Sequence, residues 1–155
     1  MTYIFIARHG PTIKKNGEKL LDEKKYKRVT PYIGKIISKF GVVDIIYTSP
    51  MDRCINTAKI LNQIFDTTIH KREELSGSVS KKNYNNQSHN CFEFSKKVSK
   101  IDKNILIVTH SSVLRSALKG VCGYDVKEFH VNEASLSIYD KKHNKFILFN
   151  NVLLK

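Results

Sequence analysis

The feature that most restricts the fold is a short apolar strand that ends in charged and turn-forming residues. Residues 3–7 are mostly apolar and lead directly into Arg8, His9 and Gly10, and Pro11 prevents the strand from continuing. A short apolar run that stops at a Gly-Pro turn is typical of a strand buried on both faces. Open α/β sheets bind ligands at the carboxyl ends of such strands. The run therefore predicts an α/β chain with an arginine and a histidine at a ligand-binding edge.

The rest of the hydrophobic pattern alternates between strands and helices. Further strands are expected at residues 42–47, 67–70 and 104–109, and as a hairpin at 134–139 and 145–149. Helices are expected at residues 23–40, kinked or divided at Pro31, and at 51–65, 91–101 and 113–118. Residues 12–18 are predicted as a polar turn and 76–90 as a surface loop. This order implies βαβ units and a mainly parallel sheet, which the terminal hairpin makes mixed.

The size and composition are those of one globular domain. The 155 residues are 41% hydrophobic, so we expect a single domain over 1–155. No apolar run approaches the ~20 residues that span a bilayer, and the sequence shows no secretory signal. Cys54, Cys91 and Cys122 include no Cys-x-x-Cys pair, which favours reduced thiols over disulfides or a zinc site. We therefore expect a cytoplasmic protein without a membrane span.

The net charge of +13 comes almost entirely from lysine. Such a charge attracts anions, including phosphorylated proteins and nucleic acids. A surface solvated by lysines explains the charge more simply, so nucleic acid is the less favoured partner. Arginine is scarce: there are five, and Arg8, Arg53 and Arg115 lie within the motifs described next. Because guanidinium groups bind phosphate through two parallel hydrogen bonds, these arginines are more informative than the lysines.

Three predicted strands, at residues 3–7, 42–47 and 104–109, end in polar motifs. If these strands are parallel, Arg8, His9, Arg53 and His110 meet at one edge of the sheet. Two arginines and two histidines form a pocket for a tetrahedral dianion. Helices that begin after Pro50 and His110 add backbone N–H groups and a favourable dipole. The sequence thus predicts a phosphate site.

The residue types also suggest how this site reacts. A neutral imidazole can attack phosphorus and become a phosphohistidine, which divides the transfer into two steps. Phosphoryl transfer otherwise needs positioning and neutralisation of charge on the equatorial oxygens. Arg8, Arg53 and His110 can supply that neutralisation, so we expect no metal ion and no organic cofactor. Arg115, one helical turn after His110, either contacts the phosphate or supports its helix.

The motifs resemble those of the histidine phosphatase superfamily, also called the phosphoglycerate-mutase-like family. Its Arg-His-Gly signature matches residues 8–10, and its Ser-Pro-x-x-Arg-x-x-x-Thr-Ala pattern matches residues 49–58 at every specified position. The segment around its second histidine matches residues 109–113, and residues 131–135 resemble its asparagine-containing approach to a late strand. Order and approximate spacing agree over nearly the whole chain.

The resemblance implies a three-layer α/β/α fold with a mixed, mainly parallel sheet of six strands. It assigns His9 as the nucleophile and Arg8, Arg53 and His110 as phosphate ligands. Thr12 and Asn16 fall where members often have further pocket residues, although Pro11 replaces the usual glutamate.

The sequence departs from the family where most members have their proton donor. A glutamate is usual two residues after a leucine that follows the third strand, but Leu75 is followed by Ser76 and Gly77. Another branch has an aspartate directly after the second histidine, and this position is serine. Glu73 or Glu74 can substitute after a shift of register; otherwise both are solvated carboxylates. The small phosphohistidine phosphatases of the superfamily have a similar length and also lack that glutamate.

Three functions fit these observations. The first is a metal-independent phosphatase whose leading substrate is protein phosphohistidine. The second is a small-metabolite phosphomonoesterase or mutase, which would require Glu73 or Glu74 in the pocket. The third is a catalytically weak module that binds a phosphorylated partner, against which the intact His9 argues.

Overall fold

The computed structural model describes residues 2–77, 81–126, 134–149 and 152–153. Its main sheet has seven strands within this part of the chain. In spatial order they are β5 (Thr68–Lys71), β4 (Ile45–Thr48), β6 (Ile105–Thr109), β1 (Tyr3–Arg8), β7 (Leu136–Asp140), β8 (Lys145–Phe149) and β9 (Val152–Leu153). The pairs among β5, β4, β6 and β1 are parallel, and the pairs from β1 to β9 are antiparallel. The predicted α/β fold with a mixed, mainly parallel sheet is confirmed, and β9 adds a short edge strand to the six expected ones.

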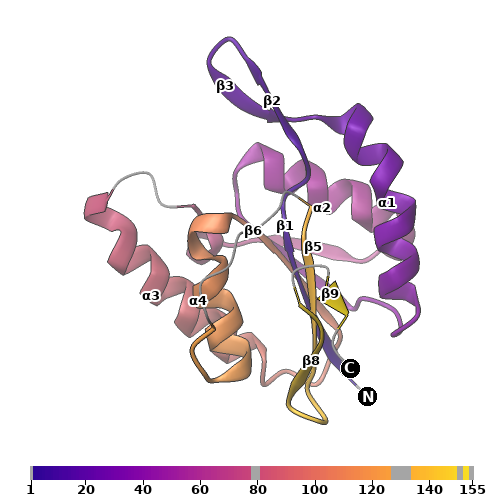
Figure 1. Cartoon of the computed structure of the whole chain (residues 1–155), viewed down its shortest axis with the longest axis vertical. Coiled ribbons are helices and arrows are strands. Elements are labelled where there is room, and N and C mark those ends of the chain that lie inside the picture. Colours follow the sequence, from indigo (N-terminus) through magenta and orange to yellow (C-terminus); the bar gives the residue numbers. More distant parts are fainter. Residues whose placement is uncertain (1, 78–80, 127–133, 150–151, 154–155) are drawn as a thin grey trace.

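Helices cover both faces of the sheet, so the architecture has three layers (Figure 1). The helices are α1 (Glu23–Ser38), α2 (Asp52–Phe65), α3 (Lys81–Val98) and α4 (Ser111–Cys122), with a 3₁₀ turn, η1, at Glu73–Leu75. Tyr3, Phe5 and Ala7 of β1 pack in the core beneath α1 and α2, whereas Ile4 and Ile6 pack beneath α3 and α4. The central strand is therefore apolar on both faces, as the run at residues 3–7 predicts.

The helix after the first turn is continuous. Asp22 caps α1, because its Oδ1 accepts a hydrogen bond of 3.1 Å from the backbone N–H of Lys25. The helix passes through Pro31 without dividing and ends at Ser38, so the alternative of two abutting helices is wrong. Asp22 also anchors this entry through its own N–H, which donates to the carbonyl oxygen of Pro11.

Residues 12–21 form a hairpin rather than only a polar turn. Its strands, β2 (Thr12–Lys15) and β3 (Glu18–Leu21), make a separate two-stranded sheet that projects beyond the body of the molecule (Figure 1). Asn16 and Gly17 connect them with φ angles of 53° and 81°. Positive φ at both central residues is the requirement of a tight hairpin turn, and Asn-Gly satisfies it at little steric cost. The turn signal was correct, but the strands on either side of it were missed.

Helix α3 begins at Lys81, ten residues before the predicted helix at 91–101. The sequence from 81 to 90 is polar, and residues 85–90 are exposed or only half-buried. This part of the helix therefore shows no apolar period from which it can be recognised. The buried side chains Cys91, Phe94 and Val98 lie in its second half, within the predicted range.

Candidate active site

The carboxyl ends of β1, β4 and β6 meet at one edge of the sheet. The parallel register pairs Arg8 with Thr109 and Thr48 with Val108, so the residues that follow these strands lie side by side. A cavity of about 140 Å³ lies there. Its lining consists of Arg8, His9, Thr12, Lys19, Met51, Arg53, Gly77, His110, Ser111 and Ser112. The predicted convergence of the two arginines and two histidines is confirmed.

His9 is held by its own backbone on both sides. Its N–H donates to the carbonyl of Thr109 at 3.2 Å, and its carbonyl accepts from the N–H of Ala134 at 3.0 Å. The ring Nδ1 lies 2.9 Å from the carbonyl oxygen of Gly10. Because a carbonyl oxygen only accepts, Nδ1 carries the proton and the lone pair of the neutral ring is at Nε2. His9 therefore has the tautomer that a phosphorus-attacking Nε2 requires.

His110 is the opposite tautomer. Nη2 of Arg53 lies 3.3 Å from its Nδ1, and a guanidinium only donates, so Nδ1 is an acceptor. Nε2 then carries the proton and donates to Oγ of Ser49 at 2.8 Å. Burial lowers the pKa of His110 to about 3, and the charges of Arg53, His9 and Arg8 contribute to the decrease. Its surroundings thus favour the neutral form of His110, and a bound dianion would oppose the arginine charges and favour its protonation.

The rings of His9 and His110 lie close together in an edge-to-face arrangement. Their centroids are 5.5 Å apart with an interplanar angle of 64°. His9 and His110 are each 4% exposed, so both rings are nearly enclosed. Rings at this separation can both contact one phosphoryl group, because an attacking nitrogen and a donor to an equatorial oxygen lie on different sides of phosphorus.

Arg53 stands in the first turn of α2, which is fixed to the turn after β1 by Thr57. Oγ1 of Thr57 donates to the carbonyl of Arg53 at 2.7 Å and accepts from the N–H of Gly10 at 3.0 Å. The threonine of the 49–58 motif therefore holds the nucleophile's turn and the arginine's helix together. Nε of Arg53 is buried and has no hydrogen-bond partner within the described chain. A buried, charged N–H donor in this position is suited to an anionic ligand.

Two helix N-termini open into the same cavity. The caps of α2 and α4 are Met51 and His110, and neither side chain makes a capping hydrogen bond. Met51, Ser111 and Ser112 all line the cavity. The first N–H groups of each helix and the positive end of its dipole therefore add to the arginine charges at this site.

The hairpin and the segment before α3 form the rim of the cavity. Thr12 lines it as expected, but Asn16 lies at the hairpin turn and is outside the lining. Lys19 of β3 lines the cavity instead, a position that recognition of the Asn-Gly hairpin would have indicated. Gly77 lies over His110: a Cβ added at Gly77 would be 3.0 Å from Cγ of the ring. The close approach leaves little room for a side chain at this rim position.

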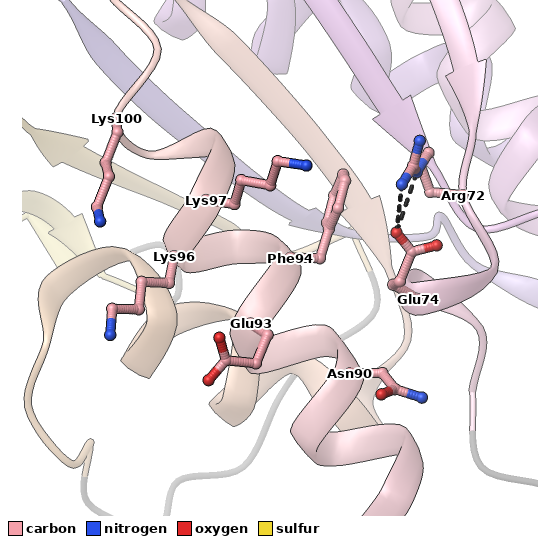
Figure 2. A pocket seen from close by; sticks show the side chains of 8 residues that line it. All are labelled: Arg72, Glu74, Asn90, Glu93, Phe94, Lys96, Lys97 and Lys100. Atoms are coloured by element: carbon pink, nitrogen blue, oxygen red, sulfur yellow. Dashed lines mark hydrogen bonds and ion pairs between the residues drawn. The ribbon is translucent and has the colours of Figure 1, made fainter.

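Glu73 and Glu74 do not line the cavity, so the structure does not place either carboxylate as a proton donor. The turn η1 buries Leu75 against the core, which directs the two glutamates outward. Glu74 lies in a separate cavity of about 540 Å³, where its Oε2 accepts from Nη2 of Arg72 at 2.6 Å (Figure 2). Arg72 in turn lies 5.0 Å from the ring centroid of Phe94. Glu73 accepts from the hydroxyl of Ser76 at 3.2 Å.

The structure also decides one of the open alternatives. Nη2 of Arg115 donates to the carbonyl of Val126 at 3.0 Å and lines a different cavity of about 220 Å³. Arg115 therefore supports the chain after α4. Of the late segment at 131–135, residues 131–133 lie outside the described residues, and Ser135 accepts the N–H of Arg8 through its carbonyl.

Within the described part of the chain, no three His, Cys, Asp or Glu side chains are grouped as a metal site. The helices described there are all too short or too polar to cross a membrane. Cys54, Cys91 and Cys122 are free thiols, as predicted.

Solved structures with the same architecture are numerous. The chain covers 100% of a phosphoserine phosphatase from Entamoeba histolytica bound to 3-phosphoglyceric acid, over 99% of its own length, with a TM-score of 0.65 and 16% identity. It covers 92% of the protein histidine phosphatase SixA complexed with tungstate, over 94% of its own length, with a TM-score of 0.65 and 12% identity. It covers 93% of a phosphoglycerate mutase from Plasmodium falciparum, over 99% of its own length, with a TM-score of 0.65 and 18% identity.

The chain has the phosphoglycerate-mutase-like fold. This confirms the fold implied by the sequence motifs. No protein-family model and no curated protein matches the sequence. The similarity to the phosphoglycerate-mutase-like structures therefore extends along almost the entire chain but concerns the fold alone.

Proposed function

We propose that this chain is a metal-independent phosphatase that forms a phosphohistidine on His9. The observation that carries the proposal is the meeting of Arg8, His9, Arg53 and His110 in one small cavity between two helix N-termini. The similarity in fold to phosphatases, among them one complexed with tungstate, supports it.

Each residue has a role in the proposed reaction. Nε2 of His9 attacks phosphorus, the new P–N bond forms, and the bond to the leaving group breaks with its electron pair on that group. Arg8 and Arg53 neutralise the equatorial oxygens, and the helix N-termini add hydrogen-bond donors. His110 becomes a further donor through Nδ1 when the bound dianion favours its protonation. A water molecule then attacks the phosphohistidine, which releases inorganic phosphate and restores the neutral His9 ring.

Protein phosphohistidine is the substrate we propose. None of the described residues that line the cavity is Asp or Glu, so no carboxylic acid there is available to protonate an alkoxide. Loss of general acid catalysis typically costs about 10² to 10⁴ in rate. Imidazole, whose conjugate acid has a pKa of about 6.5, is a much better leaving group than an alkoxide. A cavity of 140 Å³ is also small for a whole metabolite and suits a phosphoryl group presented from a larger molecule.

The test is hydrolysis, in EDTA, of an aryl phosphate and of a phosphohistidine protein. An aryl phosphate has a good leaving group, so an enzyme without an acid should still turn it over. We expect wild type to hydrolyse both, His9→Ala to lose both activities, and His89→Ala, which changes an exposed histidine, to retain both.

The ratio of the two activities separates the substrate classes. A high preference for the phosphohistidine protein supports the proposed substrate, and a preference for phosphomonoesters favours a small-metabolite phosphatase. If wild type is inactive on both yet binds phosphate, the catalytic proposal fails and a phosphate-binding module is favoured.

A further inference from the structure

The β2–β3 hairpin has two faces of different charge. Its register places Thr12 opposite Leu21, Lys14 opposite Lys19, and Lys15 opposite Glu18. Because side chains alternate along a strand, Thr12, Lys14, Lys19 and Leu21 share one face, and Lys15 and Glu18 share the other. Leu21 is buried in the core, while Thr12 and Lys19 line the active-site cavity. The first face is therefore the one that continues outward from the site.

The cavity-side face carries an uncompensated pair of like charges. Lys15 opposes Glu18, which is the favourable arrangement across two strands, but Lys14 opposes Lys19. Like charges directly opposite one another destabilise an antiparallel pair. Both lysines are exposed, and neither forms an ion pair with a carboxylate of the described residues. An anion between Lys14 and Lys19 would relieve this repulsion.

We propose that Lys14 and Lys19 form a second anion site, which binds an acidic side chain close to the phosphorylated residue of a protein substrate. The inference rests on the proposed function, since it assumes that a phosphorylated residue occupies the adjacent cavity. Lys19 connects the two sites, because it lines that cavity and lies directly opposite Lys14 across the hairpin.

The spacing fits an extended peptide. Lys14 lies two residues beyond Thr12 on β2, which is about 7 Å of strand. An acidic residue one or two positions from the phosphorylated residue lies about 3–7 Å along an extended peptide. The hairpin projects from the body of the molecule (Figure 1). Because its Thr12 and Lys19 line the cavity, a bound segment can follow it outward. Aspartate or glutamate in the substrate then takes the place that Glu18 has beside Lys15 on the other face.

The experiment compares two phosphohistidine peptides of equal length, with either glutamate or glutamine on both sides of the phosphorylated residue. Their kcat/KM values are measured for wild type, for the double variant K14Q/K19Q and for the control K15Q/K24Q. The control removes the same charge from the other hairpin face and from the exposed surface of α1. Binding of both peptides is measured in parallel by anisotropy, with each lysine variant combined with His9→Ala so that no turnover occurs.

We expect wild type and the control to prefer the glutamate peptide about fivefold in kcat/KM, and the His9→Ala proteins to show the same preference in binding. In K14Q/K19Q the preference should fall to about one, and added salt should reduce it in wild type. Equal use of both peptides by wild type, or an undiminished preference in K14Q/K19Q, would overturn the inference.

The binding series separates this inference from the proposed function. If wild type turns over neither peptide while the glutamate preference in binding depends on Lys14 and Lys19, the function fails and the second site stands. If both peptides are hydrolysed equally well, the function stands and the second site fails. A loss of affinity for both peptides by the same factor in K14Q/K19Q assigns the lysines a general charge effect and also overturns the site.

Discussion

The floor and the rim of the cavity are built in different ways. The floor consists of Arg8, His9, Arg53 and His110, which lie at or beyond the ends of buried parallel strands. His9 and His110 are each 4% exposed and are fixed by hydrogen bonds to their neighbours. The rim consists of the projecting hairpin and the segment before α3, which contains Gly77, and Lys19 of the hairpin is exposed. In the proposed function, the chemistry therefore takes place at the enclosed floor, and substrate recognition at the exposed rim.

The largest effect is expected when a floor arginine is changed. Arg53→Ala should lower kcat/KM for an aryl phosphate on the order of 100-fold or more, because it removes both a donor to the developing charge and the partner of His110 Nδ1. Arg53→Lys should recover only part of this activity, since an ammonium lacks the planar fork. Steady-state kinetics measure both. If the Arg53→Ala enzyme is as active as wild type, Arg53 does not stabilise the transition state.

The burial of His110 in the floor should also affect how the stability of the protein depends on pH. The pKa of His110 is about 3 in the folded chain. Between about pH 6.5 and 3, His110 is therefore protonated in the unfolded chain but remains neutral in the native chain. This contribution is present above pH 6.5 and lost as the pH falls, with a slope of at most about 1.4 kcal/mol per pH unit. Between pH 7 and 4, the free energy of unfolding measured in urea should fall less steeply with decreasing pH for His110→Gln than for wild type.

The control for that series is His89→Gln, which changes an exposed histidine on α3. It should follow the wild-type slope. Equal slopes for wild type and His110→Gln would mean that His110 is protonated in the native protein at pH 4.

A moderate effect is expected where the rim touches the floor. In Gly77→Ala the new Cβ would lie 3.0 Å from Cγ of His110, closer than nearly all such contacts, so the ring or the segment must shift. We expect kcat/KM to fall a few-fold, because small displacements in a reacting site are costly, with little change in the urea midpoint. A loss of stability without loss of activity would show that the segment around residue 77 shifts and that the His110 ring keeps its position.

The smallest effect is expected at the two glutamates. Glu73→Gln and Glu74→Gln should keep activity within about twofold, since general acid loss, by contrast, costs 10²-fold or more. Glu74 is paired with Arg72 in the other cavity, and Glu73 accepts from Ser76. A large loss of activity on phosphomonoesters in either variant, with normal stability, would return that residue to the active site and favour the metabolite phosphatase.

The difference between the floor and the rim also explains which site residues could be predicted from the sequence. Arg8, His9, Arg53 and His110 were predictable because each follows a recognisable buried strand, and parallel strands bring such residues to one edge. Gly77 and the first half of α3 were not, because their positions depend on contacts that no local period records. Asn16-Gly17 gave a hairpin signal, but the flanking strands are mostly exposed and lack an apolar alternation. The orientation of Glu74 away from the cavity was also not predictable, because it depends on its pairing with Arg72, which packs on Phe94.

The most direct test of the account is detection of the covalent intermediate. The protein is mixed with an aryl phosphate, quenched within milliseconds in alkali, which preserves phosphohistidine, and mapped by mass spectrometry after proteolysis. We expect one added phosphoryl group on the peptide that contains His9, at full occupancy no more than one per chain, and none in His9→Ala. Turnover that persists in His9→Ala, or a phosphoryl group found on another residue, would contradict it.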